Sequence, residues 1–164
     1  MCLPIFLLIG FSSFAQKAFN IENILPYSTA VKETARTRGN IKTIGFKRAR
    51  HFMTAFPDAE NVRWLPIQSG TIALFTIDGK KIRADYDQEG RWLFNLRHYD
   101  ETGLPANVRK QLVMTYYDYK INSVDEIETD SQTIYLVNME GRKSYKTIMV
   151  NGDDMEIFNS FNKF

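Results

Sequence analysis

The segment Asp85-x-Asp87-x-Glu89-Gly90 has the alternating carboxylates of the first half of a calcium-binding loop. Such a loop also needs a bidentate glutamate eleven residues after its first ligand. That position holds Leu96, so only half of the ligand set is present. A turn that closes a β-hairpin explains the same residues, and we favour it over a weak cation site.

No other segment has the spacing of a catalytic site. His51 and His98 are 47 residues apart without metal-ligand spacing, so we expect them on a helix surface and at a strand end. Asp153 and Asp154 are adjacent, and on a strand their carboxylates would point to opposite faces. The chain contains no nucleotide-binding, zinc-protease or serine-hydrolase motif. We therefore predict no catalytic residue, cofactor or metal, and keep an enzyme with dispersed carboxylates as an alternative.

Successive residues of a strand point to opposite faces of a sheet, so the residues of the central strands divide into two sets. One phase holds four aromatic side chains, which we expect in the core under helices: Trp64, Tyr86, Trp92 and Phe94. The opposite phase holds four polar side chains, which we expect on an open face of the sheet: Arg83, Asp85, Asn95 and Arg97. Arginines beside aromatic edges often anchor interfaces, so this face is a candidate site for a protein or peptide partner. An ordinary solvated face is the alternative.

One helix and four strands must position these residues. The helix has an apolar stripe made of Ala49, Phe52, Met53 and Phe56. Pro57 ends it, because proline lacks the N–H of the next backbone hydrogen bond. Alternating strand segments follow near 62–64, 71–77, 82–86 and 92–96. The dipeptide Asp78-Gly79 predicts a tight hairpin turn, so the strands should be antiparallel.

The same plan returns 61–62 residues later. Pro105 opens a second helix whose apolar stripe is Val108, Leu112, Val113, Tyr116 and Tyr117. Four strands follow near 120–129, 133–139, 143–150 and 154–161. The turns Glu140-Gly141 and Asn151-Gly152 stand 62 residues after Asp78-Gly79 and Glu89-Gly90. Matching turns at one spacing indicate an internal duplication, with repeats at 46–100 and 103–161.

These elements predict an α+β fold with a single domain over 46–161. One repeat alone barely hides a core, but two can share a continuous sheet. We expect tandem units, each a helix plus four antiparallel strands, forming a two-layer sandwich with both helices on one face. The other face would stay open to water or to a partner.

The first fifteen residues resemble a secretion signal. Leu3–Phe11 is almost purely apolar, and Ser13-Phe14-Ala15 fits the small-x-small cleavage rule. The run is shorter than the roughly 20 residues of a transmembrane helix. No Lys or Arg precedes it, and a buried N-terminal strand or helix is the alternative. Cleavage near Ala15 would release a periplasmic or secreted protein without cysteine, which excludes thiol catalysis.

The composition of residues 16–45 indicates a basic leader or linker. Segment 17–50 has eight basic and two acidic residues, a net charge of +6, whereas 51–164 carries −4. We favour a solvated leader over a segment that contacts anionic lipid or polysaccharide. We expect no nucleic-acid partner, because an exported protein meets little nucleic acid.

With 44% hydrophobic and 24% charged residues, the chain is neither disordered nor a coiled coil. The sequence does not indicate an oligomeric state.

Five short motifs follow one another in a fixed order along the chain. They are Phe56-Pro57-x-Ala59-x-x-Val62-x-Trp64, Asp78-Gly79, Ala84-x-Tyr86-Asp87-x-x-Gly90-x-Trp92, Leu104-Pro105-x-x-Val108 and Tyr117-x-Tyr119-x-Ile121. Over about 46–160 the chain thereby resembles the PepSY-like, beta-lactamase-inhibitor-like exported domains of Bacteroidetes. The resemblance implies tandem helix-plus-sheet units outside the cytoplasm and no established activity. Asp125 stands near the position equivalent to Trp64, so no inhibitory residue is carried over.

We therefore expect an exported, non-enzymatic binding module that holds a protein, for example a hydrolase, on the open sheet face. A periplasmic small-ligand or cation sensor that uses the acidic turn is the first alternative. The enzyme with dispersed carboxylates is the second.

Overall fold

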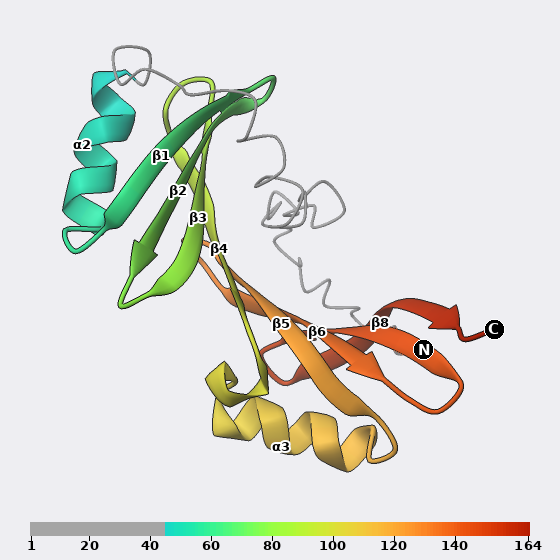
Figure 1. The fold of residues 1–164 in the computed structure, drawn as a ribbon. Coiled ribbons are helices and arrows are strands. Elements are labelled where there is room, and N and C mark those ends of the chain that lie inside the picture. Colours follow the sequence, from blue (N-terminus) through green and yellow to red (C-terminus); the bar gives the residue numbers. More distant parts are fainter. Residues whose placement is uncertain (1–44) are drawn as a thin grey trace, which may run out of the picture.

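The computed structural model describes residues 45–164 (Figure 1). The first half holds α2 (Phe46–Ala55), β1 (Glu60–Ile67), β2 (Gly70–Ile77), β3 (Lys80–Asp87) and β4 (Trp92–Tyr99). The second half holds the short helix η3 (Glu101–Gly103), α3 (Ala106–Thr115), β5 (Lys120–Glu128), β6 (Thr133–Glu140), β7 (Ser144–Asn151) and β8 (Asp154–Asn162). The predicted signal sequence and the leader up to residue 44 lie outside the described residues.

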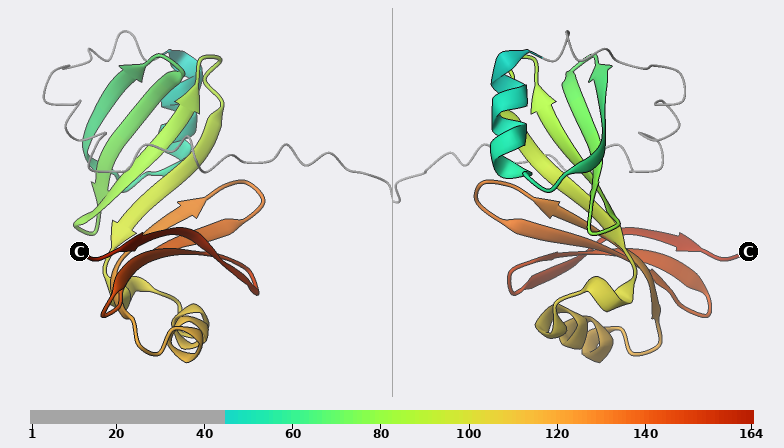
Figure 2. Two further views of the ribbon diagram at one scale, coloured as in Figure 1. Left: turned by 90° about the vertical axis from the view of Figure 1, so that its right-hand side faces the viewer. Right: turned by 60° about the vertical axis from the view of Figure 1, so that its left-hand side comes forward.

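All eight strands form one antiparallel sheet in sequence order, from β1 at one edge to β8 at the other. Hairpins join successive strands, except that η3 and α3 connect β4 to β5. The α+β class and the positions of the expected strands are confirmed. The sheet twists strongly, so its first and last strands run in different directions (Figure 2). Within residues 45–164, neither helix is long and apolar enough to cross a membrane.

Local backbone chemistry explains the hairpins. Asp78 and Gly79 both have positive φ, 50° and 73°, as the tight turn between β2 and β3 requires. At the start of β2, a Cβ on Gly70 would lie 1.9 Å from the Tyr86 carbonyl oxygen, so no larger residue fits there. These positions bring β2 and β3 into register along their full length.

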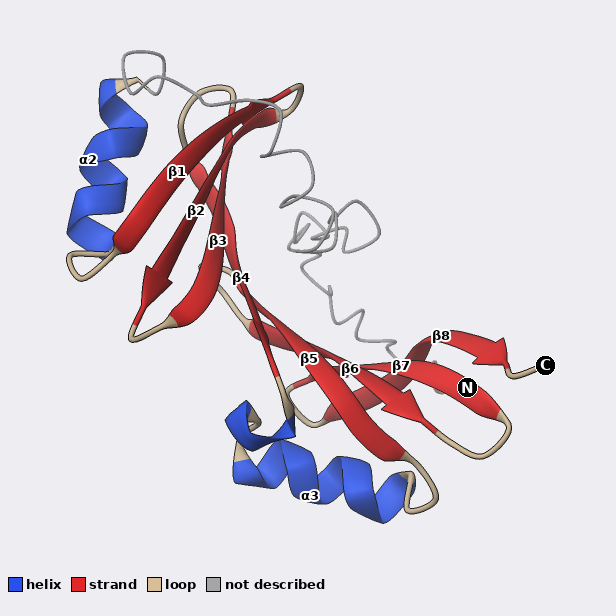
Figure 3. Cartoon of the chain, viewed as in Figure 1, coloured by secondary structure: helices blue, strands red, loops and turns tan. Residues whose placement is uncertain are grey.

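The two helices lie against different parts of the sheet (Figure 3). Each packs on its own apolar cluster. The α2 cluster contains Phe52, Phe56, Ala73, Phe75, Ile82, Ala84 and Tyr86. The α3 cluster contains Leu104, Val108, Leu112, Ile121, Val124, Val137, Met139, Ile148 and Val150. Each large side chain buried in this way contributes about 1.5–3 kcal/mol. Met53 and Val113, expected in the apolar stripes, are instead 66% and 43% exposed, because each short helix buries only a narrow stripe. Tyr117 is 85% exposed because α3 ends at Thr115 and this residue lies in the turn that follows.

The strand register places both clusters on the same face of the sheet. Ala84 of the α2 cluster lies opposite Asn95, and Tyr99, two alternations further along β4, lies opposite Val124 of the α3 cluster. Cross-strand partners share a face, so α2 and α3 cover one side. We call this side the helical face and the opposite side the non-helical face.

A bulge in β4 changes which residues reach each face. Trp92 lies opposite Tyr86 and Phe94 opposite Asp85, which leaves Leu93 without a cross-strand partner. An extra residue inverts the alternation beyond it. Trp64, Tyr86 and Trp92 pack under α2 as expected, but Phe94 lies on the non-helical face. The expectation that all four aromatics share the helical core is therefore wrong for Phe94.

The non-helical face is apolar over the middle of the sheet. Its clusters contain Leu65, Ile67, Ile72, Leu74, Phe94, Leu96, Ile127, Ile134, Leu136 and Met149. Ile72 and Leu74 of β2 are buried, as are Leu96 of β4 and Ile127 of β5. The expectation of an open, polar face is wrong for these strands, because both alternating phases of β2 carry apolar side chains.

Candidate functional site

Arg83 and Asp85 form a buried ion pair on the non-helical face. The guanidinium donates two hydrogen bonds to the carboxylate, both of 2.6 Å. The side chains are only 3% and 7% exposed. Burial raises the pKa of Asp85, although the hydrogen bond and the charge of Arg83 act in the opposite direction. A pair that is buried to this extent presents almost no surface to a partner.

Asn95 and Arg97, in contrast, lie on the helical face, between the two helix-covered clusters. Asn95 is the cross-strand partner of Ala84, and Arg97 is the partner of Ile82. The four polar residues that we expected together are thus divided between opposite faces. The bulge at Leu93 is the physical reason, because it reverses the orientation of every later residue of β4.

Arg97 is the centre of a polar cluster that joins β4 to β5, and we call this cluster the β4–β5 seam. Its guanidinium donates to Glu126 at 2.5 Å and to Glu128 at 2.7 Å. The Tyr99 hydroxyl also donates to Glu126, at 2.6 Å. Burial, together with this bond, raises the pKa of Tyr99 above its usual value, so the hydroxyl keeps its proton. The two glutamates converge on a cation, which makes the seam a structural joint between the two halves of the sheet.

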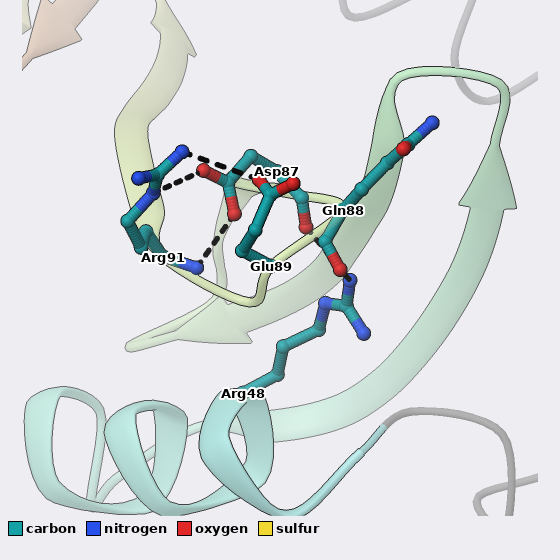
Figure 4. A network of polar contacts seen from close by, with 5 residues as sticks. All are labelled: Arg48, Asp87, Gln88, Glu89 and Arg91. Carbon is teal, nitrogen blue, oxygen red and sulfur yellow. Dashed lines mark hydrogen bonds and ion pairs between the residues drawn. The ribbon is translucent and has the colours of Figure 1, made fainter.

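The acidic segment is the turn between β3 and β4, as predicted (Figure 4). Arg91 binds Asp87 through its backbone N–H at 2.8 Å and its side-chain Nε at 2.5 Å, and binds Glu89 at 3.2 Å. Arg48 of α2 donates to the carbonyl oxygens of Asp87 and Gln88, at 2.7 and 2.6 Å. The turn therefore ties α2 to the sheet.

The carboxylates of this turn do not converge on a possible cation position. Asp85 points to Arg83, whereas Asp87 and Glu89 bind Arg91. Partial burial acts to raise the pKa of Asp87, but the hydrogen bonds and charge of Arg91 outweigh it and lower that pKa. Throughout residues 45–164, no three His, Cys, Asp or Glu side chains are grouped as metal ligands.

The two histidines lie on opposite faces of the sheet. His51 of α2 is half-buried rather than on an open helix surface. Its ring stacks on Trp92 with centroids 5.9 Å apart, and Nδ1 lies 3.1 Å from the Tyr86 hydroxyl. His98 lies near the end of β4, as predicted, with Nδ1 2.8 Å from Asp125 Oδ1 on the non-helical face.

A second polar network, which the sequence patterns did not indicate, crosses the non-helical face of the second half. Asn138 donates to Ser123 at 3.2 Å and accepts from Thr147 at 2.8 Å. Its amide also lies 3.5 Å from Asp125. The signal that could have located it is the alternation of polar residues at 123, 125, 138 and 147.

Two exposed aromatic rings adjoin this network. Tyr145 and Phe161 are cross-strand partners on the non-helical face and are 44% and 61% exposed. The Lys163 ammonium lies 4.6 Å from the Tyr145 ring centroid and pairs with Glu140. We call the following residues the β5–β8 surface: Ser123, Asp125, Asn138, Tyr145, Thr147 and Phe161.

These features define a class of α+β protein in which one eight-stranded antiparallel sheet carries two helices on one face. Solved structures from several Bacteroides species have a similar fold. A DUF2874 family protein from Bacteroides uniformis has a TM-score of 0.59 at 17% identity, covering 72% of this chain and 88% of that one. A protein from Bacteroides eggerthii, provisionally described as periplasmic, has a TM-score of 0.58 at 15% identity, with coverages of 72% and 88%.

A BLIP-like protein from Bacteroides fragilis has a TM-score of 0.61 at 14% identity and covers 79% of this chain and 91% of that one. At these identities the likeness establishes the fold. No protein-family model and no curated protein matches the sequence.

Proposed function

We propose that this chain is an exported, non-enzymatic binding module of the PepSY-like, BLIP-like type, which holds a protein partner on the β5–β8 surface. The observation that carries the proposal is the pair Tyr145 and Phe161, two exposed aromatic rings on a face that neither helix covers. Aromatic side chains within a polar surround are the residues that dominate binding energy in protein interfaces. Ser123, Asn138 and Thr147 would supply hydrogen bonds beside them.

The order of elements supports a duplicated origin for the module. Each half has a ten-residue helix followed by four antiparallel strands. Both helices end in the same way, with the backbone N–H of the next residue, Phe56 or Tyr116, donating to a carbonyl four residues earlier. The matched dipeptides Asp78-Gly79 and Glu140-Gly141 both lie where the second strand of their half leads into the third, although Glu140 is the last residue of β6 rather than part of the turn. These parallels support two repeats at 46–100 and 103–161 that share one sheet as a two-layer sandwich.

A role outside the cytoplasm and without catalysis is supported by two kinds of observation. The signal-like segment 1–15 and the periplasmic description of the B. eggerthii protein agree on export. Asp87 and Glu89 form ion pairs with Arg91, and Glu126 and Glu128 form ion pairs with Arg97. Carboxylates held in such ion pairs are poorly suited to acid–base catalysis. Intact-mass analysis of the secreted protein would test export, with a mature chain that starts at Gln16 as the expected result.

The binding surface can be tested with a matched pair of variants. A photo-crosslinking residue at position 145 should trap a partner, which mass spectrometry then identifies. We expect Tyr145→Ala combined with Phe161→Ala to weaken binding of that purified partner at least about tenfold in calorimetry.

The control is Met114→Ala on α3, an equally accessible site (70% exposed) on the helical side. It should leave the affinity unchanged. Equal affinity of the wild type and the double variant would refute this surface, and the failure of position 145 to crosslink any partner would refute the proposal as a whole.

A further inference from the structure

The two edges of the sheet differ in how well they are protected. An edge strand exposes unpaired backbone N–H and C=O groups, which can pair with another chain. The β1 edge carries Pro66, a register shift between Glu60 and Arg63, and Asn61 in a left-handed conformation with φ 54°. Proline and irregular backbone are the usual means of blocking strand addition. The β1 edge is therefore protected.

The β8 edge has much less protection. It runs for nine residues without proline, and its one irregularity is Phe158, the extra residue where the pairing with β7 shifts register. Ile157, Phe158 and Phe161 are 49%, 39% and 61% exposed. A long edge with exposed aromatic and branched side chains is suited to pairing with another strand.

Charges of opposite sign mark the two ends of this edge. The turn before β8 and the start of the strand carry Asp153 and Asp154, both exposed. At the other end, the Lys163 backbone N–H donates to the Lys143 carbonyl at 2.8 Å, which brings the exposed Arg142 and Lys143 beside the end of β8. At about 3.3 Å per residue, roughly 26 Å separates the acidic end from the basic end.

We propose that two copies of this chain associate through antiparallel pairing of β8 with β8. A two-fold axis near the middle of the strand brings Asp153 and Asp154 of each copy to the end of β8 where Arg142 and Lys143 of the other lie, about two strand spacings or roughly 10 Å away, within reach of these long side chains. A parallel arrangement would bring like charges together, so the charge pattern selects the antiparallel one. The pairing would join the two eight-stranded sheets into one and cover the exposed Ile157 and Phe158 near the middle of β8.

This inference goes beyond the proposed function and is tested with charges that lie outside the β5–β8 surface. We would measure sedimentation equilibrium of the full chain over a range of concentrations. We expect a reversible dimer whose dissociation constant rises at about 1 M salt, because exposed charges are then screened. A wild-type chain that stays monomeric up to millimolar concentration would overturn the proposal, even if it bound an unrelated extended peptide.

Two complementary variants make the test specific. Variant A combines Asp153→Lys with Asp154→Lys, so that both of its ends are basic. Variant B combines Arg142→Glu with Lys143→Glu, so that both of its ends are acidic. Alone, each should show a dissociation constant at least tenfold higher than the wild type. An equimolar mixture should form an A–B dimer with nearly wild-type affinity, because both contacts are then between opposite charges.

The control for net charge is Lys80→Glu combined with Lys81→Glu, at the exposed start of β3, which should dimerise like the wild type. Circular dichroism would establish that each variant is folded. Failure of the A–B mixture to associate, or equal dimerisation of A, B and the wild type, would refute the two-fold pairing. Capture of the partner at position 145 does not depend on these charges, so the failure of either proposal can be recognised separately.

Discussion

The indole N–H of Trp92 donates a hydrogen bond to the amide oxygen of Asn95, 2.9 Å away. Residues three apart in a regular strand point to opposite faces, so this contact requires an irregular backbone. Leu93, which has no cross-strand partner, supplies it. The same irregularity directs Arg97 into the β4–β5 seam, where it holds Glu126 and Glu128.

Removal of Leu93 should leave the faces of β4 unchanged, because Trp92 then stays opposite Tyr86 and Phe94 stays opposite Asp85. Leu93→Ala should change the free energy of unfolding by less than about 1 kcal/mol, because the side chain is 43% exposed. Deletion of Leu93 should cost less than about 3 kcal/mol, because the later residues of β4 keep their faces and their cross-strand partners. Urea unfolding of both variants measures these losses, and a loss well above about 3 kcal/mol on deletion would show that the extra residue is itself needed for the fold.

The Arg83–Asp85 pair should respond asymmetrically to substitution. Arg83→Met leaves the Asp85 carboxylate buried without its guanidinium, and we expect a loss of about 3–5 kcal/mol. Arg83→Met combined with Asp85→Leu should recover most of that loss, because both charges of the buried pair are then removed together. Denaturant unfolding of the single and double variants tests this. A double variant as unstable as the single one would show that the pair has another role.

The β3–β4 turn should stabilise the fold in a pH-dependent way. The pKa of Asp87 is lower in the folded protein than its ordinary value of 3.8. The ionised Asp87 carboxylate therefore stabilises the folded protein fully at pH values above its ordinary pKa. This stabilisation is lost as the pH falls through the lower pKa that Asp87 has in the folded protein. Thermal unfolding of wild type and Asp87→Asn between pH 7 and pH 2 should show a stability difference that narrows at the acid end.

Arg91→Gln provides the companion measurement for this turn. It should reduce the same pH dependence, because Arg91 supplies the hydrogen bonds and the charge that lower the Asp87 pKa. A wild-type advantage that persists undiminished at pH 2 would refute the linkage.

The packing of α3 can be tested with two neighbouring residues. Leu112 is fully buried, whereas Val113 is 43% exposed. Leu112→Ala should cost about 2–5 kcal/mol and Val113→Ala less than about 1 kcal/mol. Because both halves share one sheet, we expect a single unfolding transition for the wild type and both variants. Two separate transitions would show that the halves fold independently.

Local spacing was sufficient to predict the elements of this protein. The Phe52 and Phe56 spacing, with Pro57 after it, predicted α2, and Asp78-Gly79 predicted the tight turn that the backbone angles confirm. Helices and turns depend on hydrogen bonds between residues close in sequence, so their signals are contained in short segments. The apolar run 71–77 also signalled a strand buried on both faces, although we expected one open face.

The tertiary structure alone decided which side chains meet. Asn95 and Arg97 were assigned to the face of Arg83 because alternation was extended through 92–97, and nothing in that segment marks Leu93 as the extra residue. A bulge becomes evident only when the neighbouring strand is in place, since it is a mismatch between two strands. The sequence by itself therefore determined the order and type of the elements. The pairing of distant strands determined the faces, and with them the buried Arg83–Asp85 pair, the β4–β5 seam and the exposed Tyr145–Phe161 pair.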